Sequence, residues 1–390
     1  MQEKIEYINH EYDTFLTDRL LFVLKKVIPN PEKRHDYLAS FARWARWIPG
    51  PRLKTERSLE QIIRFKDKSN PLYMNSPIIL AAGGNKDGVS IASFANLGFG
   101  GVSVGTATRR PRTGNPYRPR IRMIEEDFAI QNSMGLNNVG IDEIAHRVDS
   151  QLGQTKKRRM SIGISVAETP GIEDEEMRQE DIIYTFRKAY NAADYVEINL
   201  SCPNTGHQRI DAQLRYLDRI LSNIMKIRKS LPVRKAVYAK LSPDMGEEQL
   251  LALLSLVESH GINGLVLFNT FPGTRGKYLG MKTPIEALQP VREDGDLGGL
   301  SGRPLYINTF RAVEYIKNAH PDLSIIACGG VDHGAKVFDL LRLGADAVQI
   351  YSALSYRWFA PVRMLSELHR SLLSTKATSL DDLLHGGVQF

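Results

Sequence analysis

The stretch Tyr195-Val196-Glu197-Ile198-Asn199-Leu200-Ser201-Cys202-Pro203-Asn204-Thr205 decides the fold of this 390-residue chain. Its first half is a short, mostly apolar run, which is typical of a strand covered on both faces in a parallel sheet. Its second half is polar and contains a proline, so we expect the strand to end there. Asparagine, serine and cysteine therefore follow the end of a buried strand, where α/β barrels carry their chemistry.

Seven further apolar runs lie on either side of this one and predict seven more strands. They cover residues 77–82, 101–106, 160–166, 236–241, 264–269, 324–328 and 347–351, and helical patterns separate them at 180–191, 214–229, 247–260, 305–318 and 335–343. Eight strands alternating with helices predict an α/β fold, a (β/α)8 TIM barrel. A doubly wound sheet would need G-x-G-x-x-G after its first strand, and residues 82–88 do not supply it.

We expect two units, an N-terminal helical hairpin at residues 1–70 and the barrel at 71–390. Pro31 opens the second predicted helix, which contains Trp44 and Trp47 together with Arg34, Arg43 and Arg46. The pair either packs on the barrel or lies in a membrane surface, with tryptophans at the interface and arginines near phosphates. Both interpretations stay open, since one face could pack while another contacts lipid.

Composition excludes several classes of protein. A hydrophobic content of 42% and a charged content of 24% are typical of a globular chain. The two cysteines, Cys202 and Cys328, lie in separate segments and give no disulfide framework, which favours a reducing compartment. We expect no signal peptide and no bilayer-spanning helix. The net charge of +7 has no accompanying RNA-binding or zinc signature, so we expect no nucleic-acid partner, although such a module remains a weak alternative.

Two turns, Gly329-Gly330 and the stretch from Gly344 through Ser352, together with one lysine predict a site for a phosphorylated cofactor. Gly329-Gly330 follows the seventh strand and Tyr351-Ser352 the eighth, where barrels bind phosphate through backbone N–H groups. Lys240 ends the fifth strand and should point into the barrel mouth, where a buried ammonium needs an anionic partner. That partner is either a reduced flavin or a core carboxylate such as Glu197.

Four asparagines and a threonine predict a planar polar guest. Asn132, Asn199, Asn204, Asn269 and Thr270 follow or end apolar strands or lie in glycine-containing loops. Because an amide offers a donor and an acceptor together, converging amides would read a ring of alternating N–H and C=O groups. Cys202 beside them is either a small buried residue or a general base.

Together these residues resemble dihydroorotate dehydrogenases over roughly residues 15–365, most closely the membrane-associated quinone-reducing class (class 2). The motifs that carry the resemblance are residues 81–88, 105–108 with Arg110-Pro111, 132–138, 199–205, 240–244, 269–270, 298–304 and 328–330. Among them, Gly-Gly-Leu-Ser-Gly-Arg-Pro at 298–304 is specific to that class.

The resemblance implies FMN-dependent oxidation of (S)-dihydroorotate to orotate in pyrimidine biosynthesis, with a quinone as electron acceptor. It assigns the substrate to Lys86, Asn132, Asn199, Asn204, Asn269 and Thr270, with Cys202 as the catalytic base. It assigns FMN to Ala82, Gly83, Thr106, Asn132, Ser165, Asn199, Lys240, Ser301, Gly302, Gly329, Gly330, Tyr351 and Ser352, and the quinone path to Arg122 and Tyr351. It also implies a peripheral place on the cytoplasmic side of the cell inner membrane, with a soluble cytoplasmic protein as the alternative, and it leaves the oligomeric state open.

Four positions depart from the pattern of the quinone-reducing class. Cys202 stands where that class has serine, and Ser133 stands where it has arginine. Asn85 stands where the class has aspartate, and a flavin-contacting asparagine of the third strand is either replaced by Ser165 or lost within residues 164–169. Two alternatives therefore stay open: an enzyme of the same fold that uses another dihydropyrimidine or a soluble acceptor such as fumarate, and a non-catalytic flavin-binding protein of the membrane surface.

Overall fold

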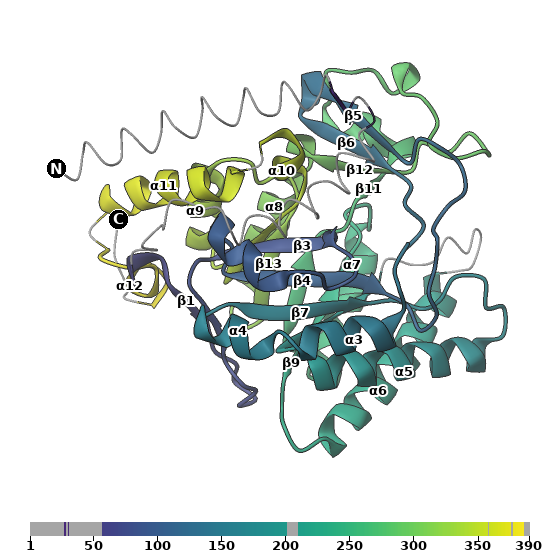
Figure 1. Cartoon of the computed structure of the whole chain (residues 1–390), viewed down its shortest axis with the longest axis horizontal. Coiled ribbons are helices and arrows are strands. Elements are labelled where there is room, and N and C mark those ends of the chain that lie inside the picture. The colour runs from purple at the N-terminus through teal and green to yellow at the C-terminus, as the bar shows by residue number, and fades with distance from the viewer. Residues whose placement is uncertain are drawn as a thin grey trace.

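A closed barrel of eight parallel strands organises the protein (Figure 1). The computed structural model describes residues 27, 28, 30, 57–200, 210–357, 359–375 and 377–385. In barrel order the strands are β10 (Gly264–Leu267), β13 (Ser324–Cys328), β14 (Ala347–Ile350), β3 (Ile78–Asn85), β4 (Gly101–Ala107), β7 (Ser161–Val166), β8 (Tyr195–Asn199) and β9 (Ala236–Lys240). Each of the eight predicted strands is confirmed, and so is the predicted fold class.

Helices cover the outside of the barrel. They are α3 (Ile141–Asp149), α4 (Leu152–Lys157), α5 (Glu175–Ala192), α6 (Ile210–Ser230), α7 (Glu247–His260), α8 (Tyr306–Ala319), α9 (Gly334–Arg342), α10 (Ser352–Tyr356), α11 (Ala360–Leu373) and α12 (Leu380–His385). The five predicted helical segments correspond to α5 to α9. Helix α5 starts earlier than predicted because Asp174 caps it, accepting a hydrogen bond from Met177 N at 2.8 Å.

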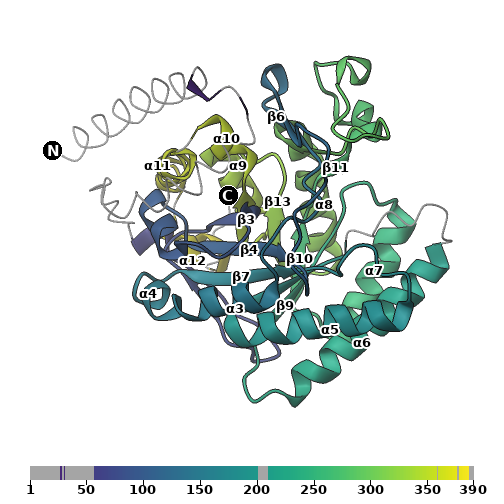
Figure 2. The same cartoon turned by 45° about the vertical axis from the view of Figure 1, so that its right-hand side comes forward.

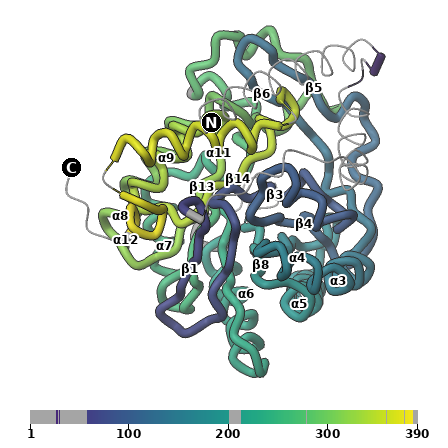
Figure 3. Tube along the Cα trace, turned by 60° about the vertical axis from the view of Figure 1, so that its left-hand side comes forward, coloured from purple at the N-terminus to yellow at the C-terminus, as the bar shows by residue number. Residues whose placement is uncertain are grey.

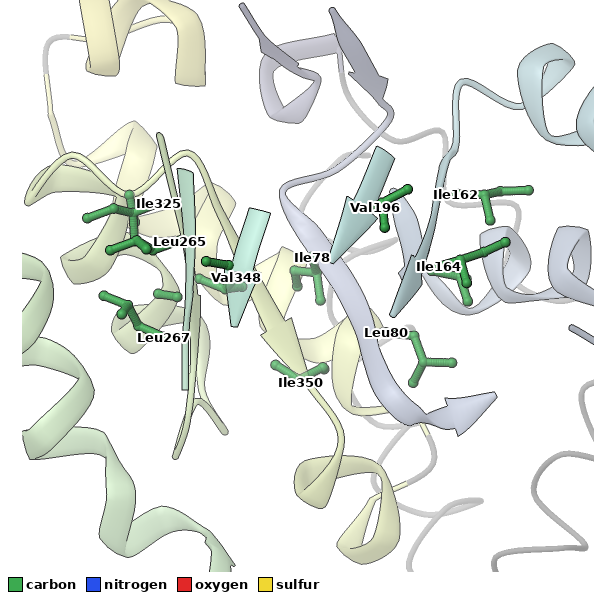
Figure 4. Close-up of a cluster of buried hydrophobic side chains, with 14 of the residues drawn as sticks. Ile78, Leu80, Ile162, Ile164, Val196, Leu265, Leu267, Ile325, Val348 and Ile350 are labelled. Atoms are coloured by element: carbon green, nitrogen blue, oxygen red, sulfur yellow. The ribbon is translucent and has the colours of Figure 1, made fainter. Parts of the chain in front are cut away.

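The main core lies between these helices and the outer face of the strands. Ile78, Ile162, Val196, Leu265 and Val348 are fully buried there (Figure 4). Burying each such side chain contributes about 1.5–3 kcal/mol. Because alternate residues of every strand face the helices, the residues between them face the barrel interior.

The barrel floor is closed by an antiparallel hairpin, β1 (Gln61–Ile63) and β2 (Leu72–Met74), which lies at the end where the barrel strands begin (Figure 1). Ile63 and Leu72 pack with Tyr195 in one buried cluster, and Figure 3 shows the hairpin near α12. The predicted boundary at residue 70 falls inside this hairpin, so residues 57–70 pack with the barrel. The helical hairpin predicted before them lies outside the described residues, apart from residues 27, 28 and 30.

A second sheet, which the strand patterns did not predict, lies at the opposite end. It consists of β11 (Phe271–Pro272), β12 (Gly299–Gly302), β6 (Ala129–Asn132) and β5 (Ile121–Ile124), all antiparallel. In Figure 2, β6 and β11 stand above the barrel strands. The short 3-10 helices are η1 (Arg57–Leu59), η2 (Ile91–Leu97), η3 (Glu125–Asp127), η4 (Gly273–Leu279), η5 (Ile285–Ala287) and η6 (Arg303–Leu305).

Candidate active site

A cleft of about 220 Å³ opens where the barrel strands end and the second sheet covers them. Carboxyl ends of parallel strands meet at one rim, so residues far apart in the sequence come together there. Of the predicted site residues, those that line the cleft are Ala82, Gly83, Lys86, Thr106, Asn132, Asn199, Lys240, Asn269, Thr270, Ser301, Gly302, Gly329, Gly330, Tyr351 and Ser352.

Four predicted residues are not among those lining the cleft. Cys202 and Asn204 lie outside the described residues. Ser165 is fully buried on β7, where its Oγ shares a hydrogen bond of 3.0 Å with Oγ1 of Thr106. Ser165 therefore supports a residue that lines the cleft, and its own contact with a flavin stays a prediction.

Arg122 is the fourth, and strand alternation places it on the far face of the second sheet. Ile121 pairs with Asn132 on β6, and both of these residues line the cleft. Arg122, one residue on, pairs with Gln131 and points the other way. Its Nε is buried and has no hydrogen-bond partner among the described residues. Arg122 therefore does not border the cleft, and its place on the quinone path stays a prediction.

Lys86 is held by the turn that follows β3. Asn85 closes this turn with two hydrogen bonds to Val89, from its Nδ2 to the carbonyl at 2.9 Å and from the Val89 N–H to its Oδ1 at 3.1 Å. Asp87 accepts a hydrogen bond from Val139 N at 3.0 Å, which joins the turn to the loop after β6. Asn85 thus stabilises the turn that positions Lys86.

The loop after β6 is fixed by Asn138 and presents Asn137 to the cleft. Asn138 is buried and donates to Thr108 Oγ1 at 2.9 Å and to the Leu136 carbonyl at 2.7 Å. The side-chain oxygen of Asn137, a cleft residue, is buried without a hydrogen-bond partner among the described residues. A buried polar atom without a partner is costly, so the cleft fits a guest that donates hydrogen bonds.

The amides of β8 and β10 meet across the barrel mouth. Asn269 Nδ2 lies 3.4 Å from Asn199 Oδ1, and Asn269 Oδ1 accepts a hydrogen bond from Thr270 N at 2.8 Å. Asn132 Nδ2 donates to the Gly299 carbonyl at 3.2 Å. Three of the four predicted asparagines therefore border one cavity, as a planar ring with several polar edges would require.

Glycines form the opposite wall, where a phosphorylated cofactor would fit. Gly83 has φ +97°, and a Cβ added there would meet no atom within 4 Å, so it would project into open space. Gly330 has φ +73°, and an added Cβ would come within 2.3 Å of Tyr306 N. Both positions favour glycine, and both leave backbone N–H groups accessible to a ligand.

Asp332 anchors this glycine turn. It accepts hydrogen bonds from Arg303 Nε at 2.7 Å, Lys336 Nζ at 2.7 Å and His333 Nδ1 at 2.8 Å. Burial acts to raise the pKa of Asp332, but hydrogen bonds from Lys336, Arg303 and His333 outweigh it and lower the pKa to about 2. Lys336 also donates to the Gly330 carbonyl at 3.0 Å, so the anchor fixes the turn itself.

The cleft floor carries a buried ion pair. Lys240 Nζ lies 3.9 Å from Glu197 Oε2, and it donates to Gln349 Oε1 at 3.2 Å. The sequence left two partners open for Lys240, a core carboxylate and a reduced flavin. The position of Lys240 is compatible with both, because Glu197 lies beside it and the lysine side chain also borders the cleft.

An aromatic wall beside the cleft was not predicted. Phe128 packs against Tyr356 with ring centroids 5.1 Å apart, and the Arg303 guanidinium lies 4.0 Å above the Phe128 ring. The Tyr356 hydroxyl donates to the Ala129 carbonyl at 2.6 Å. Only Arg303 carried a sequence signal, as part of residues 298–304, because the other side chains lie in segments without a distinctive pattern.

The described residues contain neither a metal-binding cluster nor a membrane-spanning helix. No three His, Cys, Asp or Glu side chains there are grouped so that they could hold a metal ion. No helix in the described ranges is both long enough and apolar enough to cross a membrane.

Comparison with known proteins gives one consistent family. The sequence model described as "Dihydroorotate dehydrogenase" matches residues 67–372. A "Dihydroorotate dehydrogenase (quinone)" of Dichelobacter nodosus is 34% identical over 351 residues, which cover 86% of this chain and 92% of that protein. One of the same name from Methylococcus capsulatus is 34% identical over 87% of this chain and 94% of its own length. A crystal structure of DHODH from Eimeria tenella in complex with ferulenol has a TM-score of 0.77 and 26% identity, and covers 94% of this chain and 98% of its own.

Proposed function

The chain belongs to the dihydroorotate dehydrogenase family, and we propose that it oxidises (S)-dihydroorotate to orotate with FMN bound in the cleft, passing the electrons to a quinone. One observation carries the proposal: Lys86, Asn132, Asn199, Asn269 and Thr270 line the same cavity as the glycine turns. A lysine and several amides fit a pyrimidine carboxylate, and the glycine turns fit a phosphate.

FMN would fit this cleft with its terminal phosphate against the glycine turns of the wall. Gly329, Gly330 and Ser352 would hold that phosphate through backbone N–H groups and a hydroxyl. Ser352 Oγ donates to Ser301 Oγ at 2.8 Å, which fixes both side chains at the cleft. Thr106 and Lys240 would border the ring system. The chemistry that FMN supplies when bound is the acceptance of a hydride from the substrate.

Lys86 would bind the substrate carboxylate, and the amides of Asn132, Asn199 and Asn269 would orient the ring. Cys202 would take the C5 proton of dihydroorotate, as the base of the reaction. A thiol with an ordinary pKa of about 8.5 is partly ionised near neutral pH, and general-base help of this kind contributes about 10²–10⁴-fold. Asn204 would contact the ring from the same loop.

A quinone as acceptor is supported by the names of the relatives, which are quinone-dependent enzymes.

We further propose that the segment before residue 57 places the protein peripherally on the cytoplasmic side of the cell inner membrane. Truncation tests this. Leu59 is buried in the core, so the cut should fall before Arg57 and leave η1 and the hairpin intact. A chain starting at residue 57 should keep flavin reduction by dihydroorotate and lose vesicle binding and quinone reduction. An unchanged quinone rate would reject this path.

A soluble acceptor is the second candidate, and Cys202 favours it, because cysteine at this position resembles the soluble classes of the family. Rapid mixing of the reduced enzyme with a short-chain quinone or with fumarate separates the two. We expect reoxidation by the quinone. Reoxidation by fumarate alone would establish the second candidate.

A further inference from the structure

A carboxylate lies beneath the cleft and does not border it. Glu197 is fully buried on β8, two residues before Asn199, which lines the cleft. Two residues along a strand span about 6.6 Å, and their side chains share a face. Glu197 therefore faces the barrel interior, one layer below the residues that would contact a ligand.

Glu197 is tied to the cleft by two side chains that do line it. Lys240 Nζ is 3.9 Å from Glu197 Oε2, and the side chains are 5% and 0% exposed. Gln349 connects them: its Oε1 accepts from Lys240 at 3.2 Å, and its Nε2 donates to Glu197 Oε1. The amide thereby fixes the ammonium and the carboxylate in one arrangement.

Because Lys240 and Glu197 are buried, water screens their charges little, and each charge strongly affects its surroundings. Glu197 Oε2 has no hydrogen-bond partner among the described residues, so the nearby ammonium is what compensates its charge there. Without a carboxylate below it, Lys240 would present its full positive charge to the cleft. With Glu197 in place, the charges of Lys240 and Glu197 largely cancel. The pair therefore stabilises a negative charge in the cleft much less than Lys240 alone would.

We propose that Glu197 is a positioning residue that sets the reduction potential of the bound flavin through Lys240. It holds the ammonium at the floor together with Gln349, and it cancels most of the charge that would otherwise favour the reduced flavin. This inference rests on flavin binding in the cleft, and it is independent of which dihydropyrimidine or acceptor the enzyme uses.

The test is the equilibrium potential of the flavin, measured against a reference dye without substrate or quinone. Glu197→Gln keeps the shape of the side chain and removes its charge. We expect it to favour the reduced flavin by at least tenfold at pH 7, a rise of about 30 mV for a two-electron couple.

A double-mutant cycle separates an effect through Lys240 from a direct one. In the Lys240→Met background the ammonium through which Glu197 acts is absent, so Glu197→Gln should change the ratio of reduced to oxidised flavin less than twofold. An equal shift in both backgrounds would overturn the role of Lys240. Asp181→Asn is the matched control: it removes another buried carboxylate, which accepts hydrogen bonds from Thr169 and does not line the cleft, and it should leave the potential unchanged.

Folding and flavin binding are checked separately. If Glu197→Gln does not fold, Glu197→Asp is used in its place. Aspartate is shorter by one methylene and holds its charge farther from Lys240, so this variant should raise the potential by a smaller amount. An unchanged potential in a folded, flavin-loaded variant would overturn the inference and leave the proposed function intact. A wild-type protein that binds no flavin would overturn both.

Discussion

Replacing Asp332 with asparagine should loosen the glycine turn of the cleft and lower the stability of the protein in a pH-dependent way. The Asp332 side chain is 13% exposed and accepts three hydrogen bonds from cationic or ionisable groups. An amide cannot neutralise Arg303 and Lys336, so the variant loses the ionic part of the anchor. The Gly330 carbonyl, to which Lys336 donates, then loses its fixed partner.

The magnitude follows from the pKa of Asp332. A carboxyl whose pKa falls from about 3.9 in the unfolded chain to about 2 in the native protein stabilises it by up to about 2.6 kcal/mol. Arg303 and His333 are 41% and 36% exposed, so solvent screening reduces the contribution to about 1–2 kcal/mol. Because the native pKa is the lower one, this stability is present above about pH 4 and is lost as the pH falls from about 4 to about 2.

Urea unfolding of the flavin-free protein measures this difference. At pH 7 the Asp332→Asn midpoint should correspond to a loss of about 1–2 kcal/mol, and about half of that difference should remain at pH 3. Asp322→Asn is the control, because the Asp322 pair with Lys66 is 65% and 75% exposed and should contribute less than about 0.5 kcal/mol. A difference that persists unchanged to pH 2, or no difference at pH 7, would refute the ionic origin of the anchor.

Three further substitutions test the barrel and the cleft. Gly330→Ala places a Cβ within 2.3 Å of Tyr306 N at φ +73°, so it should cost about 1–2 kcal/mol in backbone strain alone and weaken flavin retention, as a melt followed by flavin fluorescence would show. Gly163→Ala brings a Cβ within 2.3 Å of the Tyr195 ring and should destabilise the fold by about 1–3 kcal/mol in urea unfolding; an unchanged midpoint would mean that the interior repacks freely. Cys202→Ala should slow flavin reduction by dihydroorotate about 10²–10⁴-fold in stopped flow while reoxidation by quinone stays the same, and a full reduction rate would remove Cys202 from the mechanism.

The barrel could be predicted from the sequence because its strands carry a strong local signal. A parallel strand covered on both faces must be apolar along its length, so each of the eight runs stood out from the amphipathic helices. The second sheet gave no such signal. Its strands are only two to four residues long, and β12 begins and ends with a glycine, so the sheet depends on pairing between distant segments.

Site residues were predictable where the chemistry follows a strand end. Lys240 and Asn199 were found because a polar side chain closes an apolar run. Glu197 was named only as one possible partner of Lys240, since sequence alone could not choose between a carboxylate and a ligand. The bridge through Gln349 joins β14 to β8 and β9, which are not its neighbours in the barrel, and no local sequence pattern predicts it.

The orientation of Arg122 could not be predicted from the resemblance, and its place on the quinone path stays a prediction. A one-residue difference along a strand turns a side chain to the opposite face, so an assignment by motif fails to place it unless the register is known. The pairing of Ile121 with Asn132 supplies that register, and it puts Arg122 away from the cleft. The aromatic wall of Phe128 and Tyr356 could not be predicted either, because the two side chains are far apart in the sequence and meet only in the folded protein.

Anaerobic addition of (S)-dihydroorotate to the purified, flavin-loaded protein tests the central claim most directly. The account predicts that the flavin absorbance bleaches on adding the substrate, that orotate appears in equal amount, and that a quinone then restores the colour. A flavin that stays oxidised in the presence of excess dihydroorotate would contradict it.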